Sequence, residues 1–242
     1  MSTAKTSSLF HFTKNVGTIQ SILKNGFWPT LSLEDQTWLN QSHWAFPVVC
    51  FCDIPISRLT SHLNYYGNYG IGMSQEWAIE QGLSPVVYIN SNSPFAGALH
   101  ALANQKKKKS RNDFAAMAFT LGHTKPLKGK DKRNGRNHVH RNFYEECEWR
   151  YVPPIDIRSG SAPIDEKTYR NKKIRGQINE SLKANYALEV KPEDIRYILL
   201  SKESEIPEMC DYFTRWLGHH SADSLKVLMT KIISVERILS DV

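Results

Sequence analysis

The chain has 242 residues, of which 40% are hydrophobic, 11% aromatic and 23% charged, and its formal net charge is +7. The aromatic share excludes a disordered chain, and no apolar run reaches the ~18 residues that a membrane span needs. The excess of positive charge favours an anionic partner such as nucleic acid.

The expected location is the cytoplasm. The polar stretch Met1–Ser8 lacks the apolar core of a signal peptide. The four cysteines have no zinc-ligand spacing and are interpreted as reduced core residues. The paired histidines have no carboxylate or thiol at ligand spacing, so we expect no metal.

The first predicted elements are a strand and a helix. Leu9–Thr13 alternates as a short strand, and an amphipathic helix follows between an N-cap at Asn15 and Gly26. His11 and Thr13 share one face of that strand. A histidine at a strand-to-helix junction, next to free helix N–H groups, is either a structural residue or part of an anion or ribose site.

Two further segments carry candidate binding residues. Phe46–Asp53 is almost wholly apolar and predicts a strand buried on both faces, with Asp53 either in a site or capping a turn. His62–Met73 is rich in glycine and tyrosine. Glycines beside Tyr66 and Tyr69 would let a flat group stack on an aromatic ring. The alternative is a tight turn with core tyrosines.

The segment from Lys106 to Arg141, which includes Lys125, is basic and interleaved with Gly, Asn and His. One interpretation is a solvated surface. The more specific interpretation is a surface that contacts the phosphate backbone of a nucleic acid. The residues predicted to contact nucleic acid are Lys106, Lys107, Lys108, Lys109, Lys128, Lys130, Arg133, Arg136 and Arg141.

An acidic pair lies in the stretch Asn142–Pro154, whose aromatic and β-branched residues predict a strand that ends at two prolines. On a strand, Glu146 and Glu148 would share one face about 7 Å apart, with Arg150 next along it. Close carboxylates raise each other's pKa unless a cation separates them. The pattern therefore indicates either an exposed ion-pair ladder or a polar site in a cleft.

The order of strands and helices predicts an α+β domain. We expect residues 1–242 to form a single domain, with 106–141 as a basic insertion and 176–242 as a C-terminal α/β flank.

Several short motifs together resemble the AbiGi-type abortive-infection family of bacterial phage-defence proteins, and the resemblance covers most of the chain. The motifs are Leu9–Thr13 with Ile22–Phe27, Val49–Pro55, Tyr66–Gly72, Phe143–Arg150, Pro192–Ile198 and Lys231–Ile238.

More distantly, the His-x-Thr opening followed by Ile-Leu-x-x-Gly resembles ADP-ribosyltransferases, including DarT-type enzymes that modify DNA. This resemblance implies a split mixed or antiparallel sheet with peripheral helices and NAD as the co-substrate. Glu148 would be the catalytic carboxylate, and Glu146 would orient the acceptor. The residues that would hold NAD are His11, Phe12, Thr13, Asp53, Tyr66 and Tyr69.

Two hypotheses follow from these resemblances. The first is an NAD-dependent ADP-ribosyltransferase toxin of an anti-phage abortive-infection or toxin-antitoxin system, which modifies nucleic acid and is restrained by a cognate antitoxin protein. The alternative is a non-catalytic antitoxin or regulator of the same fold that binds a partner protein or nucleic acid. In the first hypothesis, loss of the Glu148 charge costs on the order of 10²-fold in rate.

Overall fold

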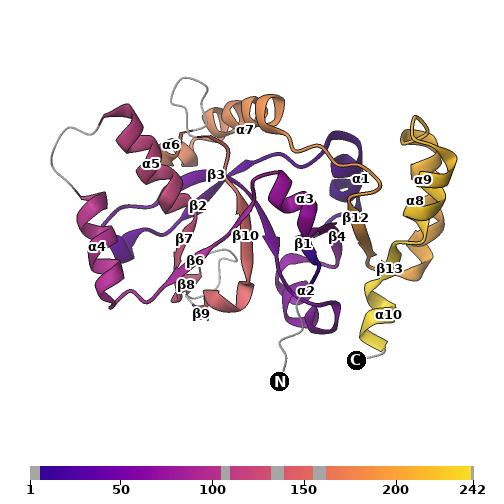
Figure 1. Cartoon of the computed structure of the whole chain (residues 1–242), viewed down its shortest axis with the longest axis horizontal. Helices are drawn as coiled ribbons and strands as arrows, with labels where there is room; N and C mark the ends of the chain where they lie inside the picture. Colours follow the sequence, from indigo (N-terminus) through magenta and orange to yellow (C-terminus); the bar gives the residue numbers. More distant parts are fainter. Residues whose placement is uncertain (1–5, 105–109, 132–138, 155–161, 241–242) are drawn as a thin grey trace. The chain divides into compact units, whose positions relative to one another are not determined.

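The structure is a computed structural model that describes residues 6–104, 110–131, 139–154 and 162–240. It contains both helices and a mixed sheet (Figure 1), in agreement with the predicted α+β class. The chain divides into two compact units. Unit 1 comprises Met1–Phe27, Phe51–Gly82 and Leu188–Val242, and unit 2 comprises Trp28–Cys50 and Leu83–Ala187. Strand β3 (Trp44–Cys52) contributes residues to both units.

Unit 1 is built on strands in the order β13-β12-β4-β1, and β1 also pairs with the last residue of β3. Strands β1 and β4 are antiparallel, whereas β12 and β13 are parallel. The strands are β1 (Ser8–Thr13), β4 (Tyr69–Ser74), β12 (Ile195–Leu200) and β13 (Ile232–Ser234). The helices are α1 (Val16–Asn25), α2 (Thr60–Tyr66), α3 (Gln75–Glu80), α8 (Ile206–Trp216), α9 (Ala222–Met229) and α10 (Val235–Ser240).

Strand β1 forms where the alternating sequence predicted it, and both of its faces contact other side chains. Phe10 belongs to a buried cluster with Leu63 of α2 and Ile238 of α10, and it pairs in register with Gly72. A Cβ on Gly72 would lie 2.8 Å from the ring of Phe10, so the absence of a side chain there makes room for that ring. The opposite face carries His11.

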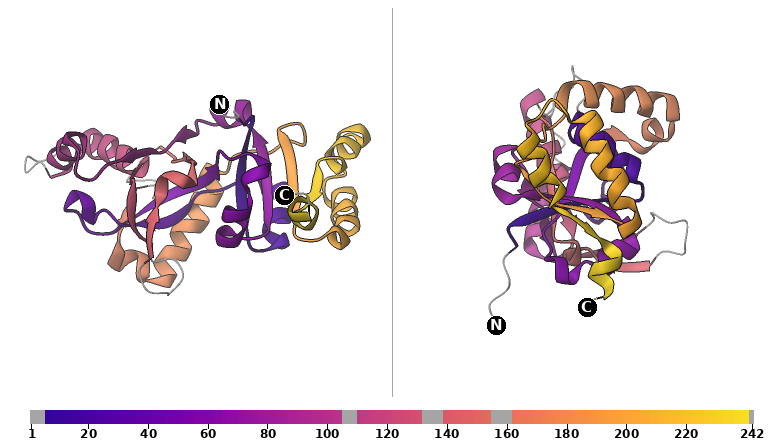
Figure 2. Two further views of the ribbon diagram at one scale, coloured as in Figure 1. Left: turned by 90° about the horizontal axis from the view of Figure 1, so that it is seen from below. Right: turned by 90° about the vertical axis from the view of Figure 1, so that its right-hand side faces the viewer.

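The C-terminal part of unit 1 is largely helical. Helices α8 and α9 lie side by side (Figures 1 and 2). Met209 and Phe213 are buried on the inner face of α8 at 1% and 0% exposure, and Pro207 occupies its first turn. The helix starts at Ile206 because proline is tolerated only where no intrahelical N–H bond is lost.

Unit 2 is organised around β3, which pairs with β2, β10 and β11, while β5 pairs with β10. The hairpin β8–β9 and the pair β6–β7 form separate two-stranded sheets. The strands are β2 (Thr30–Glu34), β5 (Ser84–Pro85), β6 (Val87–Ile89), β7 (Thr124–Pro126), β8 (Lys128–Asp131), β9 (Val139–Asn142), β10 (Glu148–Tyr151) and β11 (Ile164–Asp165). The helices are α4 (Pro94–Ala103), α5 (Arg111–Gly122), α6 (Glu166–Arg170) and α7 (Lys172–Tyr186), and a 3₁₀ turn covers Phe143–Glu146.

The main core of unit 2 lies between β3 and the helices α4 and α5. Phe46 and Val48 of β3 pack with Leu99 of α4 and Leu121 of α5. This packing confirms the prediction that β3 is a buried apolar strand.

Two smaller expectations can be compared with the structure. Cys147 is exposed, so the expectation that every cysteine lies in the core was wrong. In the described part of the chain, none of the helices has both the length and the apolar character needed to cross a bilayer.

Candidate functional site

The acidic pair does not lie on one strand. Glu146 ends the 3₁₀ turn Phe143–Glu146, Cys147 has a left-handed backbone with φ 44°, and β10 begins only at Glu148. The prediction of an extended strand from Asn142 was therefore wrong over 143–147. The left-handed backbone at Cys147 changes the direction of the chain, and the carboxylates of Glu146 and Glu148 nevertheless both contact one side chain.

Both carboxylates contact the ammonium group of Lys125 on β7. Its Nζ lies 2.7 Å from Oε2 of Glu146 and 2.6 Å from Oε2 of Glu148. Two carboxylates that would repel each other are thus bridged by one cation. Lys125 is only 5% exposed, so the expectation that it belongs to an exposed basic surface was wrong.

Arg150 completes the charge balance on β10. Its Nε donates to Oε1 of Glu148 at 2.8 Å, and Nη2 donates to Oε1 of Glu34 at 3.0 Å. Nη1 donates to the backbone carbonyl of Gly122 at 2.8 Å. Arg141 adds a longer contact, with Nη2 3.5 Å from Oε1 of Glu146. We call these six side chains the ion cluster: Glu34, Lys125, Arg141, Glu146, Glu148 and Arg150.

The centre of the ion cluster is buried: Glu146 and Arg150 are each 1% exposed, and Glu148 is 5% exposed. Burial alone would raise the pKa of Glu148, but the charges of Arg150 and Lys125 outweigh it and hold that pKa well below its usual range. Burial would likewise lower the pKa of Lys125, yet the attraction of Glu148 raises it. Glu148 and Lys125 therefore remain ionised at neutral pH.

This geometry restricts what Glu148 can do chemically. Oε1 accepts from Arg150 Nε, and Oε2 accepts from Lys125 and, at 3.3 Å, from Arg150 Nη2. A general base or an oxocarbenium-stabilising carboxylate needs an oxygen within hydrogen-bond reach of its substrate. Both oxygens of Glu148 are already bound by cations of the same chain. The arrangement is that of a buried structural ion network.

The six residues predicted to hold NAD all lie in unit 1, whereas Glu146 and Glu148 lie in unit 2. His11 packs against the rings of Phe27 and Phe51, with centroid distances of 5.2 and 5.6 Å. Phe12 stacks on Tyr66 at 6.4 Å. The His11 face of β1 is therefore occupied by aromatic side chains of unit 1, and the assignment of these residues to NAD stays a prediction.

The other residues predicted to hold NAD form hydrogen bonds with residues of unit 1. The hydroxyl of Tyr69 donates to Oε1 of Glu205 at 2.7 Å, and this hydrogen bond, followed by burial, raises the pKa of Tyr69. Asp53 accepts from the hydroxyl of Thr6 at 2.6 Å. Thr13 lies at the junction with α1, where its hydroxyl accepts from the backbone N–H of Asn15 at 3.5 Å.

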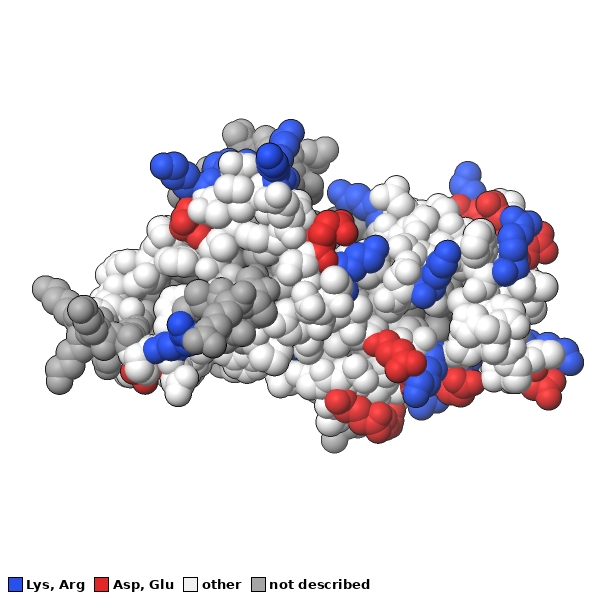
Figure 3. Space-filling model, turned by 90° about the horizontal axis from the view of Figure 1, so that it is seen from above, with Lys and Arg blue, Asp and Glu red and all other residues white. Residues whose placement is uncertain are grey.

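The basic residues divide into those the structure describes and those it does not. Lys106–Lys109, Arg133 and Arg136, together with the side chain of Lys130, lie outside the described part. Lys128 is exposed at the start of β8, and Arg141 contacts Glu146. On the face drawn in Figure 3, described basic and acidic side chains are interspersed, without a continuous basic stripe. Nucleic-acid binding stays a prediction.

The outer face of helix α4 is apolar, and it was not among the binding surfaces predicted from the sequence. The helix is capped by Ser93 and buries Ala96 and Leu99, while Phe95 and Leu102 are 58% and 48% exposed. No charged residue occurs in the sequence from Asn90 to Asn104. The signal was available, because an exposed helix normally carries charges on its outer face. Large exposed apolar side chains without charges are typical of protein interfaces.

Comparisons with known proteins point to one family. A family model described as "Putative abortive phage resistance protein AbiGi, antitoxin" matches residues 25–201. The chain is also similar to "Abortive phage resistance protein AbiGi" from Lactococcus lactis subsp. cremoris. The two are 30% identical over 226 residues, which cover 82% of this chain and 89% of the relative. No solved structure matches the chain.

Proposed function

The chain belongs to the AbiGi family of abortive phage resistance proteins, and we propose that it acts as a non-catalytic antitoxin that binds and restrains a protein partner. The word antitoxin in the family description supports this choice over the transferase hypothesis. An antitoxin requires a binding surface and no catalytic residues.

The state of Glu148 is the observation that carries the proposal. This carboxylate is the residue on which the ADP-ribosyltransferase hypothesis depends. It is 5% exposed, and Lys125 and Arg150 occupy both its oxygens. Freeing it for a substrate would leave two buried cations partly uncompensated, which typically costs ~3–5 kcal/mol. A structural role requires no such rearrangement.

Helix α4 supports a protein as the partner. It lies inside the matched range 25–201. Its exposed residues include the large apolar Phe95 and Leu102, and the small residues Ala98 and Ala101 lie between them in the sequence. Small residues allow the backbone of a second helix to approach, and the large apolar residues supply most of the buried area. We therefore propose that an amphipathic helix of the restrained toxin packs on this face.

Growth of a bacterial host tests the proposal. Induction of the chain alone should leave growth and the cellular NAD level unchanged, whereas co-expression with its cognate toxin should restore growth that the toxin alone arrests. A transferase toxin gives the opposite pattern: the chain alone arrests growth and consumes NAD. Growth arrest by the wild-type chain that is relieved in Glu148→Gln would refute the antitoxin proposal.

The contribution of α4 is tested by Phe95→Lys, with Ile174→Lys as the matched control. Ile174 is also a large apolar residue exposed on a helix of unit 2, at 37%. Phe95→Lys should abolish the rescue from the toxin because a charge enters an apolar contact, and Ile174→Lys should retain it. If both variants rescue equally, the toxin does not bind at α4.

A further inference from the structure

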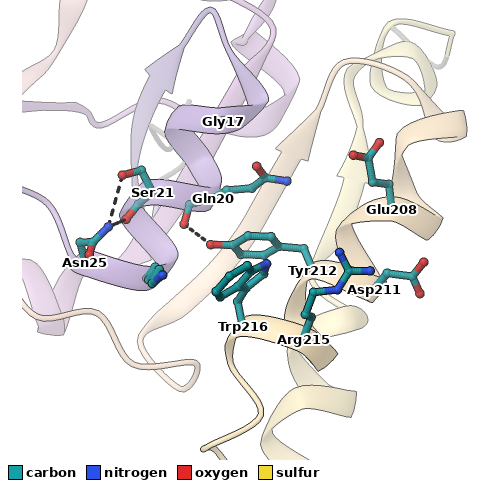
Figure 4. A pocket seen from close by; sticks show the side chains of 10 residues that line it. Gly17, Gln20, Ser21, Asn25, Glu208, Asp211, Tyr212, Arg215 and Trp216 are labelled. Carbon is teal, nitrogen blue, oxygen red and sulfur yellow. Dashed lines mark hydrogen bonds between the residues drawn. The ribbon is translucent and has the colours of Figure 1, made fainter.

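A groove lies between helices α1 and α8 of unit 1, with a volume of about 620 Å³ (Figure 4). Gly17 and Lys24 of α1 belong to one wall, and Asp211, Tyr212 and Trp216 of α8 belong to the other. The family model ends at residue 201, so α8 lies beyond the matched range. A ligand of this groove is therefore distinct from the contact proposed for α4.

The two walls are held together by the protein itself. The hydroxyl of Tyr212 donates to the backbone carbonyl of Gln20 at 2.7 Å, which ties α8 to α1. Met209 and Phe213 anchor the opposite side of α8 in the core. Because both helices are fixed, the groove exists before any ligand binds, which lowers the entropic cost of binding.

One wall already binds a cation. The ammonium of Lys24 lies 4.3 Å from the ring centroid of Trp216, and this indole is 47% exposed. An ammonium or guanidinium group above an indole is attracted by the negative face of the ring. The geometry thus shows that Trp216 attracts positive charge, and that a competing cation can reach its exposed surface.

Two carboxylates lie on the same wall. Glu208 and Asp211 are exposed, three residues apart on α8, and neither forms an ion pair with another described residue. Residues three apart on a helix point to the same side. Lys24 and Arg215 balance their charge overall, but Lys24 is engaged with the indole. Arg215 lies four residues from Asp211 on the same side of α8 and lines the same groove, but no ion pair joins it to either carboxylate. Asp211 and Glu208 can therefore pair with a cation from outside.

We propose that this groove binds an arginine or lysine side chain presented by a segment of a partner protein. The cation would replace Lys24 on Trp216 and would be neutralised by Asp211 and Glu208. Tryptophan and tyrosine are the residue types that dominate binding energy at protein interfaces, which favours a protein over a small ion as the ligand. The proposal does not rest on the antitoxin function, because it concerns a different surface.

Fluorescence anisotropy with the full-length chain tests the proposal at low salt. The probes are the peptide Gly-Arg-Gly-Arg-Gly amide and its glutamate counterpart, both carrying a neutral dye. Because the net charge of the chain is +7, non-specific attraction favours the acidic peptide. Preferential binding of the arginine peptide is expected, and equal or stronger binding of the glutamate peptide would overturn the proposal.

Variants locate the site. Trp216→Ala should weaken binding by ~tenfold, a loss between those expected for an exposed and for a desolvated cation–π contact. Gly17→Trp should block the groove, whereas Gly17→Ala should bind normally, since nothing lies within 4 Å of a Cβ at this position. The comparison of Gly17→Trp with Gly17→Ala shows whether the peptide binds in the groove even if Trp216→Ala does not fold. Unchanged binding by Gly17→Trp would overturn the proposal.

Removal of the Lys24 charge should strengthen binding of the peptide rather than weaken it. Lys24→Gln should tighten binding of the arginine peptide by ~threefold, because the indole no longer has a resident cation. Lys183→Gln is the matched control, because the Lys183 ammonium also lies 4.3 Å from an indole centroid, that of Trp28, in unit 2. The control should leave binding unchanged. Weaker binding by Lys24→Gln would contradict competition between the two cations.

Discussion

Replacing Glu148 with glutamine separates the structural hypothesis from the catalytic one. In the wild-type chain, the carboxylate accepts hydrogen bonds from Lys125 and Arg150 through both oxygens. A glutamine keeps one acceptor oxygen, but its NH₂ group must then face one of these two donors. The substitution therefore removes a buried negative charge and also creates a donor–donor contact inside the ion cluster.

The expected loss of stability follows from burial. Lys125 and Arg150 are 5% and 1% exposed, so water cannot replace the lost charge. Removing one member of a buried ion pair typically lowers the free energy of unfolding by ~3–5 kcal/mol. The remaining carboxylates, Glu146 and Glu34, compensate in part, so we expect ~3 kcal/mol. Urea denaturation at pH 7, followed by circular dichroism, measures this difference.

Glu145→Gln is the control. Glu145 undergoes the same chemical change three residues earlier, in the 3₁₀ turn, but it is exposed. Among the described residues its side chain accepts a hydrogen bond from Asn142 at 2.8 Å. Its loss of stability should stay within ~0.5 kcal/mol. If Glu148→Gln is as stable as the wild-type chain and lacks an NAD-dependent activity that the wild-type chain has, Glu148 is a catalytic residue and the structural reasoning fails.

The remaining predictions concern the pH dependence of the cluster and two glycines. The pKa of Glu148 is lower in the folded chain than in the unfolded chain, where it is ~4.3. Ionised Glu148 therefore stabilises the fold fully above pH ~4.3, and this stabilisation is lost as the pH falls through the folded pKa. The difference in unfolding free energy between wild type and Glu148→Gln should thus be constant from pH ~6 to ~9 and shrink below pH ~4; a constant difference down to the acid transition would contradict this. Gly67→Ala should lower the unfolding free energy by ~2 kcal/mol or more, because φ is +119° and the new Cβ would lie 2.4 Å from the carbonyl oxygen of Thr13. Gly176→Ala, in the middle of α7 with nothing within 4 Å, should raise the unfolding free energy by ~0.5–1 kcal/mol, and a loss would contradict the helix assignment.

The elements that the sequence predicted well are those with local signals. Helix α1 begins after Asn15 and ends before Gly26, whose φ of 77° suits glycine. Strand β1 covers Ser8–Thr13, where alternation predicted a strand, and β3 is buried as its apolar run predicted. Helix α8 has proline in its first turn, where that residue is tolerated. Each of these features depends on residues within one or two turns of one another.

The ion cluster could not be predicted in this way because its members come from four strands and one 3₁₀ turn. The partner of the acidic pair is Lys125, which lies 21 and 23 residues upstream of Glu146 and Glu148. Its position in a lysine-rich segment indicated a solvated surface, and no local pattern distinguishes the one lysine that becomes buried. The left-handed Cys147 gave no signal either, because glycine or asparagine normally marks that conformation.

The balance of charge in the cluster also explains why a motif that resembles a catalytic one can serve a different purpose. Catalysis requires a carboxylate whose charge is only partly compensated, so that the substrate supplies the missing interaction in the transition state. In this chain, Lys125 and Arg150 supply that compensation permanently, and the bonds join β7 to β10 within unit 2. The Glu-x-Glu-x-Arg segment therefore links two strands of unit 2 through charged hydrogen bonds. In the functions that we propose, exposed groups such as Phe95 and Trp216 make the contacts with other molecules.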